Sequence, residues 1–491
     1  MNPLIERAND ALQTLASQVG QNFYPHYHLA PPAGWMNDPN GLIFFNGQYH
    51  AFYQHHPYDE NWGPMHWGHA TSHDMLSWQH QSIALAPGDL WDKDGCFSGC
   101  AVDDNGVLSL IYTGHVWLKG EGDDSAIREV QCLATSQDGI HFDKQGVVLN
   151  PPEGIMHFRD PKVWFEDACW WMVVGARDER DHGQVLLYRG NSLQQWQFMQ
   201  VLARADDSMG YMWECPDFFP LENEHILMFS PQGLAAKGYL NRNLFQSGVL
   251  RGKWQPGADF KPSQPFTELD LGHDFYAPQS LLTADGRRVI IGWMDMWQSP
   301  MPTKADNWSG CLTLPRELSI DCDGNLLIKP VREVEALRQA GEFITSMTLA
   351  QEKQLLHENC QSLELQLTWD TTASHAERYG VQLADAQGTG GKVSVYVDSQ
   401  ANRLVLDRYY PQYGLTGYRS VVLPEQGVLS LRIFIDSSSL EVFINDGQAC
   451  MSSRIYPTEH ERCLSLYAEN GQAQLLHGEY WQLVAKSSRR N

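Results

Sequence analysis

Three acidic residues lie in sequence blocks that could do acid–base or nucleophilic chemistry: Asp38, Asp160 and Glu214. Taken alone, an Asp that precedes Pro at the start of a strand is usually a turn residue that caps backbone amides. The three blocks are Trp35-Met36-Asn37-Asp38-Pro39-Asn40-Gly41, Phe158-Arg159-Asp160-Pro161 and Met212-Trp213-Glu214-Cys215-Pro216-Asp217. Together they predict a site built from three carboxyl groups rather than three unrelated turns.

The neighbours of these acids predict different charges. Trp213 and Cys215 flank Glu214, and apolar surroundings raise the pKa of a carboxyl group, so we expect a protonated Glu214 near neutral pH. Arg159 precedes Asp160, and an adjacent guanidinium favours the ionised carboxylate. Cleavage of a glycosidic bond uses one carboxyl to protonate the leaving oxygen and another to attack the anomeric carbon. A third, permanently ionised carboxylate can hold sugar hydroxyls and stabilise the oxocarbenium-like charge.

The elements that must position these acids are short strands. From residue 23 to 335, β-like runs alternate with Gly, Asn, Asp and Pro turns, as in residues 41–45 and 48–54, which flank Asn46-Gly47. Many short strands without helices between them predict a propeller or a large sandwich, because long antiparallel sheets must close or stack to hide their edges. At four strands per blade, the length fits about five blades, although no literal repeat is visible. Each acid would then lie on a different blade and point to a central axis.

Two further segments complete the predicted organisation. Apolar residues at helical spacing predict an amphipathic helix within residues 1–22, ahead of the propeller at 23–335. Residues 330–340 form a second helical stretch, and we expect a linker helix at 336–345. From 346 to 491 the strands alternate cleanly, as at Leu431, Ile433 and Ile435, which predicts a β-sandwich. The fold class is therefore all-β, and the sandwich is expected to cover one side of the first domain rather than to bind sugar itself.

Composition excludes several classes of protein. The chain has 491 residues, 35 Lys and Arg against 59 Asp and Glu, and a net charge of −24, so nucleic acid and anionic membranes are not expected partners. The sequence contains no run of 18 apolar residues, so no membrane span is predicted. Charged residues interrupt the N-terminal segment, where a secretory signal would be apolar. Ten scattered cysteines without a CxxC pair indicate reduced thiols in a cytoplasmic protein. The 17 tryptophans include flat faces that suit sugar rings.

The three blocks, in this order, resemble the hallmarks of glycoside hydrolase family 32, the invertases and other β-fructofuranosidases. The resemblance runs from about residue 23 to the C-terminus and implies a five-bladed propeller followed by a sandwich. It implies that Asp38 is the nucleophile, Glu214 the acid/base, and Asp160 with Arg159 the transition-state stabiliser. It further implies a fructose pocket, whose expected binding residues are Trp35, Asn37, Gln54, Trp62, Phe97, Ser98, Arg159, Tyr276 and Trp293.

The implied reaction is a retaining double displacement on sucrose, with the nucleophile and acid carboxyls about 5 to 5.5 Å apart. Sucrose 6-phosphate is the closest alternative substrate, because hydrolases of both sugars share the three motifs. Fructosyl transfer and fructan cleavage are further enzymatic alternatives, and a non-catalytic sugar-binding propeller is the alternative from another class. We expect no cofactor and no metal, since the histidines between residues 26 and 80 lack a matched third ligand and an HExxH motif. Oligomeric state is left open.

Overall fold

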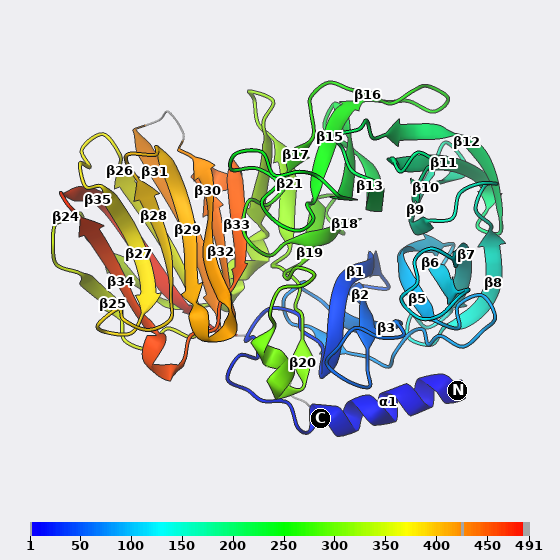
Figure 1. The fold of residues 1–491 in the computed structure, drawn as a ribbon, viewed down its shortest axis with the longest axis horizontal. Helices are drawn as coiled ribbons and strands as arrows, with labels where there is room; N and C mark the ends of the chain where they lie inside the picture. Colours follow the sequence, from blue (N-terminus) through cyan, green and yellow to red (C-terminus); the bar gives the residue numbers. More distant parts are fainter. Residues whose placement is uncertain (1, 424–426, 485–491) are drawn as a thin grey trace.

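The computed structural model describes residues 2–423 and 427–484. Strands dominate it, and the chain forms two groups of sheets that lie side by side (Figure 1). The hairpin predicted around Asn46-Gly47 is confirmed, because Phe45 pairs with Gln48 across that turn. Within the described residues, no helix is long and apolar enough to cross a membrane.

Residues 34–330 form five antiparallel sheets, with one short parallel pair between β1 and β20. The first sheet contains β1 (Gly34–Phe45), β2 (Gln48–His56), β3 (His66–Ser72), β4 (Gln79–His80) and β20 (Trp308–Ser309). The second contains β5 (Gly95–Asp104), β6 (Val107–Trp117), β7 (Ile127–Ser136) and β8 (Asp143–Leu149). The third contains β9 (Phe158–Glu166), β10 (Cys169–Arg177), β11 (Gly183–Ser192) and β12 (Gln195–Arg204).

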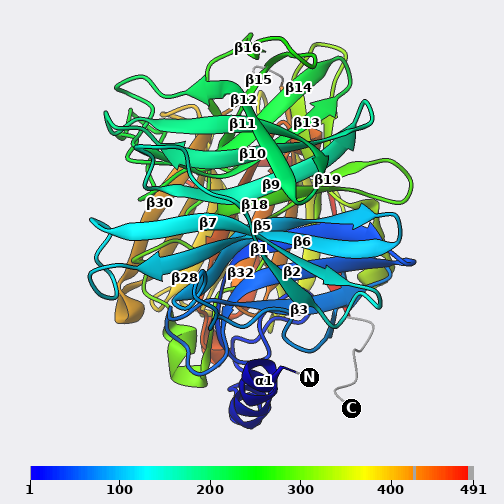
Figure 2. The ribbon, with the colours of Figure 1, turned by 90° about the vertical axis from the view of Figure 1, so that its right-hand side faces the viewer.

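The remaining two of these sheets follow directly in the chain. The fourth contains β13 (Met212–Leu221), β14 (Glu224–Gln232), β15 (Gly248–Lys253), β16 (Lys261–Pro262) and β17 (Thr267–Glu268). The fifth contains β18 (Tyr276–Leu282), β19 (Arg288–Trp293), β21 (Arg316–Ile320) and β22 (Leu326–Pro330). Contacts between the first strands of the sheets form a closed cycle, from β1 to β5, β9, β13, β18 and back to β1. Figure 2 shows β1, β5, β9 and β18 close to the centre of the view.

The second group contains two sheets that enclose one apolar core. One has β23 (Arg338–Ile344), β24 (Met347–Leu349), β26 (Leu363–Asp370), β31 (Val428–Asp436), β32 (Ser439–Ile444), β33 (Ala449–Arg454) and β35 (Ala473–Leu483). The other has β25 (Gln354–His357), β27 (Arg378–Ala384), β28 (Lys392–Asp398), β29 (Arg403–Tyr410), β30 (Leu415–Val422) and β34 (Cys463–Glu469). Leu431, Ile433 and Ile435 all face this core, as their alternation predicts.

The N-terminal helix is present as α1 (Pro3–Ala16). The Asn2 side chain accepts a hydrogen bond from the Leu4 amide and caps its first turn. Ile5 and Ala8 are buried against Ile83 and Ala86, so the apolar stripe docks the helix on the first group of sheets. Short 3-10 helices occur at η1 (Pro302–Asp306), η2 (Arg332–Leu337), η3 (Pro411–Tyr413), η4 (Asn445–Gly447) and η5 (Glu459–Glu461).

The linker helix expected at 336–345 is wrong. Only η2 is helical, and from Arg338 to Ile344 the chain is strand β23, which pairs with β35. Val334 and Leu337 are the buried residues of η2, which gives it one short apolar contact. Beyond Leu337, pairing with β35 of the second group of sheets satisfies the backbone groups, and this tertiary contact overrides helix propensity.

Buried charge joins the two groups of sheets. Arg316 of β21 is fully buried and forms ion pairs with Asp270, at 2.8 Å, and with Glu441 of β32, at 2.5 Å. Arg454 of β33 pairs with Asp295 at 2.9 Å. Removal of one partner from such a pair leaves an uncompensated buried charge. These contacts therefore hold the second group of sheets against the first.

Candidate active site

The first strand of each of the five sheets is interrupted at the position where it carries a site residue. The register of β1 shifts between Met36 and Pro39, and that of β13 between Glu214 and Asp217. Similar shifts occur at Phe97/Gly99 on β5, beside Arg159 on β9 and at Tyr276/Gln279 on β18. Such β-bulges bend a strand and redirect its side chains.

Four of these bulges contain a residue followed by Pro. The pairs are Asp38-Pro39, Asp160-Pro161, Cys215-Pro216 and Ala277-Pro278, and β5 has Ser98-Gly99 at the equivalent place. Asp160, Cys215 and Ala277 have positive φ values of 66°, 48° and 50°. Non-glycine residues in this conformation are strained, and such strain persists only where the surrounding structure enforces it. The inner strands therefore share one local geometry, which turns their side chains to a common pocket.

Asp38 is buried at the centre of this pocket. The Ser98 hydroxyl donates to its Oδ2 at 2.7 Å, and the Asn37 amide donates to its Oδ1 at 3.0 Å. The Cys215 thiol lies 3.5 Å from Oδ2. Both carboxylate oxygens are thus held in place by donors, which fixes the orientation of a potential nucleophile.

Asp160 lies beside the same thiol. Its Oδ2 accepts a hydrogen bond from the Cys215 backbone amide at 2.9 Å, and the Cys215 Sγ lies 3.6 Å from it. The Asp160 backbone amide donates to the Thr113 hydroxyl at 3.0 Å. Cys215 therefore contacts two of the three predicted acids, Asp38 and Asp160, and brings them into one cluster.

Glu214 has polar partners, contrary to the apolar surroundings expected from its sequence neighbours. Arg159 donates to Oε1 through Nη2 at 2.8 Å and through Nε at 3.0 Å. Tyr276 and Gln232 donate to Oε2 at 2.5 and 3.0 Å. The expectation failed because side chains that are adjacent on a strand point to different places: Trp213 stacks on Phe229, away from the carboxyl.

The expected charge of Asp160 is also wrong. Arg159 forms its ion pairs with Glu214 and Glu129, and no ion pair joins it to Asp160 in the described residues. Burial, followed by the negative charge of Glu214, raises the pKa of Asp160 to about 8, while Arg159 opposes the shift. Burial and the charge of Glu214 also raise the pKa of Asp38, against the hydrogen bonds from Ser98 and Asn37.

The raised pKa of Asp160 predicts a stability change. Between about pH 4 and pH 8, folded Asp160 keeps a proton that the unfolded chain has lost, so this residue makes the fold less stable as pH rises. Asp160→Asn removes that penalty, and Asn tolerates the positive φ. We expect the variant to gain up to about 5 kcal/mol at pH 8, from about four pKa units at ~1.4 kcal/mol each, and less than about 1 kcal/mol at pH 4. Thermal unfolding across this range measures it, and an equal or lower melting temperature at pH 8 would contradict the assignment.

Sequence reasoning missed several residues of the site. Glu129 on β7 is buried, pairs with Arg159 at 3.3 Å, and binds His115 at 3.2 Å. Burial raises the pKa of Glu129, but the charge of Arg159 together with the hydrogen bonds from His115 and the Phe158 amide outweighs burial and lowers that pKa to about 2. Gln232 on β14 holds Glu214. No local motif marks these residues, because they lie on later strands of their sheets, β7 and β14, and reach the site only through strand pairing.

The pocket has a volume of about 340 Å³. Asp38, Asp160 and Glu214 all line it. Among the predicted binding residues, the lining includes Asn37, Gln54, Trp62, Phe97, Ser98 and Arg159, and it also includes His115, Glu129, Gln232 and Trp297. A hollow of this size, with polar groups on several sides and aromatic rings at its edge, fits a small polar ligand.

Trp35, Tyr276 and Trp293, which are also predicted to bind substrate, are not among the residues that line this pocket. Trp293 is fully buried. The centre of its ring lies 4.9 Å from that of Trp297 and 5.9 Å from that of Trp35. The Trp35 indole donates to Asn37 at 2.6 Å, and Tyr276 donates to Glu214. The geometry therefore gives these three residues a positioning role.

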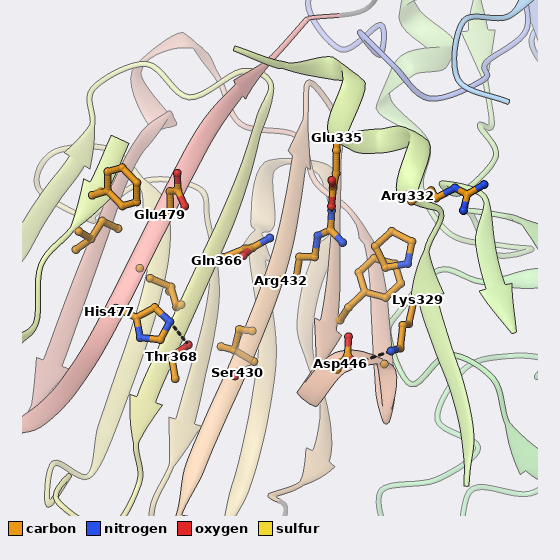
Figure 3. Close-up of a pocket in the computed structure, with 18 of the residues that line it drawn as sticks. Lys329, Arg332, Glu335, Gln366, Thr368, Ser430, Arg432, Asp446, His477 and Glu479 are labelled. Atoms are coloured by element: carbon orange, nitrogen blue, oxygen red, sulfur yellow. Dashed lines mark hydrogen bonds and ion pairs between the residues drawn. The ribbon is translucent and has the colours of Figure 1, made fainter. Parts of the chain in front are cut away.

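A larger hollow, of about 990 Å³, lies elsewhere, between β22 and η2 on one side and β26, β31 and β35 on the other (Figure 3). Its polar lining is largely paired: Lys329 contacts Asp446 at 2.5 Å, and Thr368 binds His477 at 3.2 Å. None of the three acids lines it. Size alone therefore does not identify the chemical site in this protein.

No metal-binding group of three or more His, Cys, Asp or Glu residues occurs in the described ranges 2–423 and 427–484. The histidines near the N-terminus have other partners. His28 contacts Asp436 at 2.8 Å and Glu441 at 2.7 Å, and it helps to join the two groups of sheets. All ten cysteines are unpaired.

Comparison of the sequence with known proteins identifies the family to which the chain belongs. Residues 28–330 match the Glycosyl hydrolases family 32 N-terminal domain, and residues 333–482 match the Glycosyl hydrolases family 32 C terminal domain. A sucrose-6-phosphate hydrolase of Escherichia coli is 64% identical over 479 residues, which cover 98% of this chain and 99% of that protein. A raffinose invertase of Escherichia coli is 61% identical over 484 residues, which cover 99% of this chain and 100% of that protein.

Solved structures agree with the sequence matches. A family 32 β-fructofuranosidase mutant of Bombyx mori, in complex with sucrose, has a TM-score of 0.87 at 34% identity and covers 99% of each chain. A sucrose-6-phosphate hydrolase of Lactobacillus gasseri has a TM-score of 0.85 at 28% identity, over 97% of this chain and 96% of that one. The two family domains together account for nearly the whole sequence. The protein is a glycoside hydrolase that belongs to glycosyl hydrolases family 32.

Proposed function

We propose that the protein is a retaining β-fructofuranosidase that hydrolyses sucrose to glucose and fructose. The observation that carries this proposal is the convergence of Asp38, Asp160 and Glu214 from three inner strands onto one pocket. Two carboxyl groups in distinct environments, with a third nearby, are the groups that glycosidic cleavage needs. The sucrose complex of the Bombyx mori relative supports sucrose as the ligand.

In this mechanism Asp38 attacks the anomeric carbon of the fructosyl ring while Glu214 protonates the glucosyl oxygen. Water, deprotonated by Glu214, then releases fructose from the ester with Asp38. The donors Ser98 and Asn37 hold the Asp38 carboxylate in one orientation for attack. Gln54 and Trp62 line the pocket near these groups and are proposed to contact the fructosyl ring.

Asp160 is proposed to stabilise the positive charge that develops on the fructosyl ring. Its pKa is raised by burial and by the charge of Glu214, so the cluster retains a proton at neutral pH. When that proton lies on Glu214, the charge next to Asp160 disappears and Asp160 ionises more easily. This arrangement, with the acid protonated and Asp38 and Asp160 ionised, is the one that the reaction requires.

We further propose that the five sheets of residues 34–330 are the blades of a β-propeller, and that residues from β23 onward form the sandwich domain. The closed cycle of contacts among β1, β5, β9, β13 and β18 supports this architecture. Radial packing of the blades leaves only short, protected sheet edges and brings one bulge from each blade to the central axis. The unpaired cysteines fit the proposed cytoplasmic location.

Sucrose 6-phosphate is the second candidate substrate, because relatives of 64% and 46% identity carry the name sucrose-6-phosphate hydrolase. Initial rates of the purified protein on sucrose and on sucrose 6-phosphate, at matched concentrations, decide between the two. We expect a larger kcat/KM on sucrose. The reverse ratio would assign the phosphorylated sugar as substrate, and activity on neither would contradict both assignments.

A further inference from the structure

A second cavity, of about 250 Å³, adjoins the catalytic pocket. Trp297 lines both hollows, so the two share a wall. The second cavity lies where the β14–β15 loop and the segment after β19 meet strands β29 and β30 of the sandwich. At about 30 Å³ per water molecule, it has room for roughly eight waters, which is enough for a phosphate group with several attached atoms.

The lining of this cavity is cationic in a chain that is strongly acidic. Arg242, Arg408 and Arg419 line it, and no Asp or Glu is among its lining residues. The net charge of the whole chain is −24, whereas the charged residues that line this cavity are all positive. We name this cavity the arginine pocket.

The arginine pocket contains polar atoms without partners. Arg408 is 6% exposed; its Nη1 donates to Asp274 at 2.5 Å and to the Arg454 carbonyl at 3.1 Å, while its Nε has no partner among the described residues. His273 is 3% exposed, and its Nδ1 has no partner there either. The unsatisfied Nε–H of Arg408 costs free energy, so it indicates a ligand or water that completes it. The His273 Nε2–H donates to the Gly417 carbonyl at 2.9 Å, so the Nδ1 of its neutral ring is an acceptor.

The other two arginines make no hydrogen bond to a carboxylate among the described residues, although the charges of Asp274 and Glu268 act on Arg419 from nearby. Arg419 binds the Asn243 side chain and the Arg242 carbonyl, and Arg242 binds the Gly238 carbonyl, so these bonds use neutral acceptors. Burial, together with repulsion from Arg408 and Arg242, lowers the pKa of Arg419 to about 10. Mutual repulsion of this kind is relieved when an anion binds between the guanidinium groups.

We propose that the arginine pocket is a binding site for a phosphate monoester carried on a sugar. The phosphate has two possible sources, and for the first of them, the substrate, this inference rests on the proposed function. The phosphate belongs either to the substrate, as sucrose 6-phosphate with its fructosyl ring over Asp38, or to a separate sugar phosphate beside Trp297. Guanidinium groups bind phosphate through paired, charge-assisted hydrogen bonds, and this chemistry is the same for both sources.

The test removes one positive charge at a time. Arg419→Gln and Arg242→Gln are the test variants, and Arg242 is exposed, so its replacement does not endanger the fold. Arg403→Gln is the matched control. Arg403 lies on β29, and its guanidinium carbon lies 3.8 Å from the ring centre of Tyr239, in the β14–β15 loop that also carries Arg242. It does not line the arginine pocket. Each protein is assayed on sucrose and on sucrose 6-phosphate, and binding of glucose 6-phosphate is measured by calorimetry.

If the phosphate belongs to the substrate, kcat/KM on sucrose 6-phosphate falls at least about tenfold in the test variants, mainly through KM, while sucrose is unaffected. If the phosphate belongs to a separate ligand, the test variants bind glucose 6-phosphate about tenfold more weakly than the wild type. They should then hydrolyse sucrose and sucrose 6-phosphate as the wild type does. Either result supports the site, and added KCl should weaken the interaction.

The proposal is overturned if neither quantity changes by more than about twofold relative to Arg403→Gln. Should the wild-type protein hydrolyse neither sugar, the proposed function fails, whereas the calorimetric measurement with glucose 6-phosphate still decides whether the arginine pocket binds a phosphate monoester.

Discussion

Asp38→Asn is expected to lower kcat on sucrose by at least about 10⁴-fold while the protein stays folded. The amide has nearly the shape of the carboxylate; its one oxygen can accept from the Asn37 amide and its NH2 can donate to the Ser98 hydroxyl, yet it cannot form the fructosyl ester. The melting temperature should be unchanged or higher, because the variant no longer buries a charge whose pKa is raised. Steady-state kinetics and thermal unfolding measure the two effects.

The matched control for this variant is Asp59→Asn, which lies outside the pocket lining with its side chain about half exposed. It should keep nearly full activity. Asp38→Ala adds a second test, since azide that enters the vacated space attacks from the same side and gives the α-fructosyl azide in a single displacement. Turnover within tenfold of the wild type in Asp38→Asn would show that another group is the nucleophile.

Glu214→Gln is expected to lower kcat on sucrose by about 10² to 10⁴-fold, the usual contribution of acid/base catalysis. The glucosyl oxygen is a poor leaving group that requires a proton. An aryl β-fructofuranoside with an acidic phenol needs little protonation, so its first step should survive and the fructosyl ester should accumulate. Pre-steady-state release of the phenol measures this burst.

Azide discriminates the two carboxyl roles. In Glu214→Gln it attacks the accumulated ester without base catalysis and gives the β-fructosyl azide, opposite to the α product expected with Asp38→Ala. Glu224→Gln is a suitable control, since Glu224 is on the adjacent strand and pairs with Arg251 at 2.9 Å, outside the pocket lining. Equal loss on sucrose and on the aryl fructoside would contradict the acid/base role.

Local patterns predicted much of the fold. Period-2 alternation placed Leu431, Ile433 and Ile435 in the sandwich core, and helical spacing located α1. Asp436 lies on the opposite face of β31 from these three residues, and its carboxylate contacts His26 and His28 of the segment that precedes β1. A period shows which side chains share a face, but it does not show what covers that face.

The three predicted acids share one pocket, whereas the electrostatics predicted for them differ from those of the structure. Asp38, Asp160 and Glu214 line one pocket, as the three motifs predict. The charge environment was read from residues adjacent in sequence, and strand geometry sends adjacent side chains apart, so Arg159 pairs with Glu214 instead of Asp160. pKa values follow spatial neighbours, which only the assembled sheets define.

An internal repeat was present without being recognised. Asp38-Pro39, Asp160-Pro161, Cys215-Pro216 and Ala277-Pro278 mark the bulges of four inner strands. A residue followed by Pro is common in ordinary turns, so this signal becomes specific only when the pairs are known to occupy the same position on successive sheets.

The most direct test of the proposed mechanism is the stereochemistry of transfer to methanol. Sucrose is cleaved by the wild-type protein in the presence of methanol, and the first methyl fructofuranoside formed is identified by NMR. Double displacement through an ester on Asp38 predicts the β-anomer, with the configuration of sucrose retained. Formation of the α-anomer would contradict a covalent intermediate on Asp38 and would require a single displacement by the acceptor.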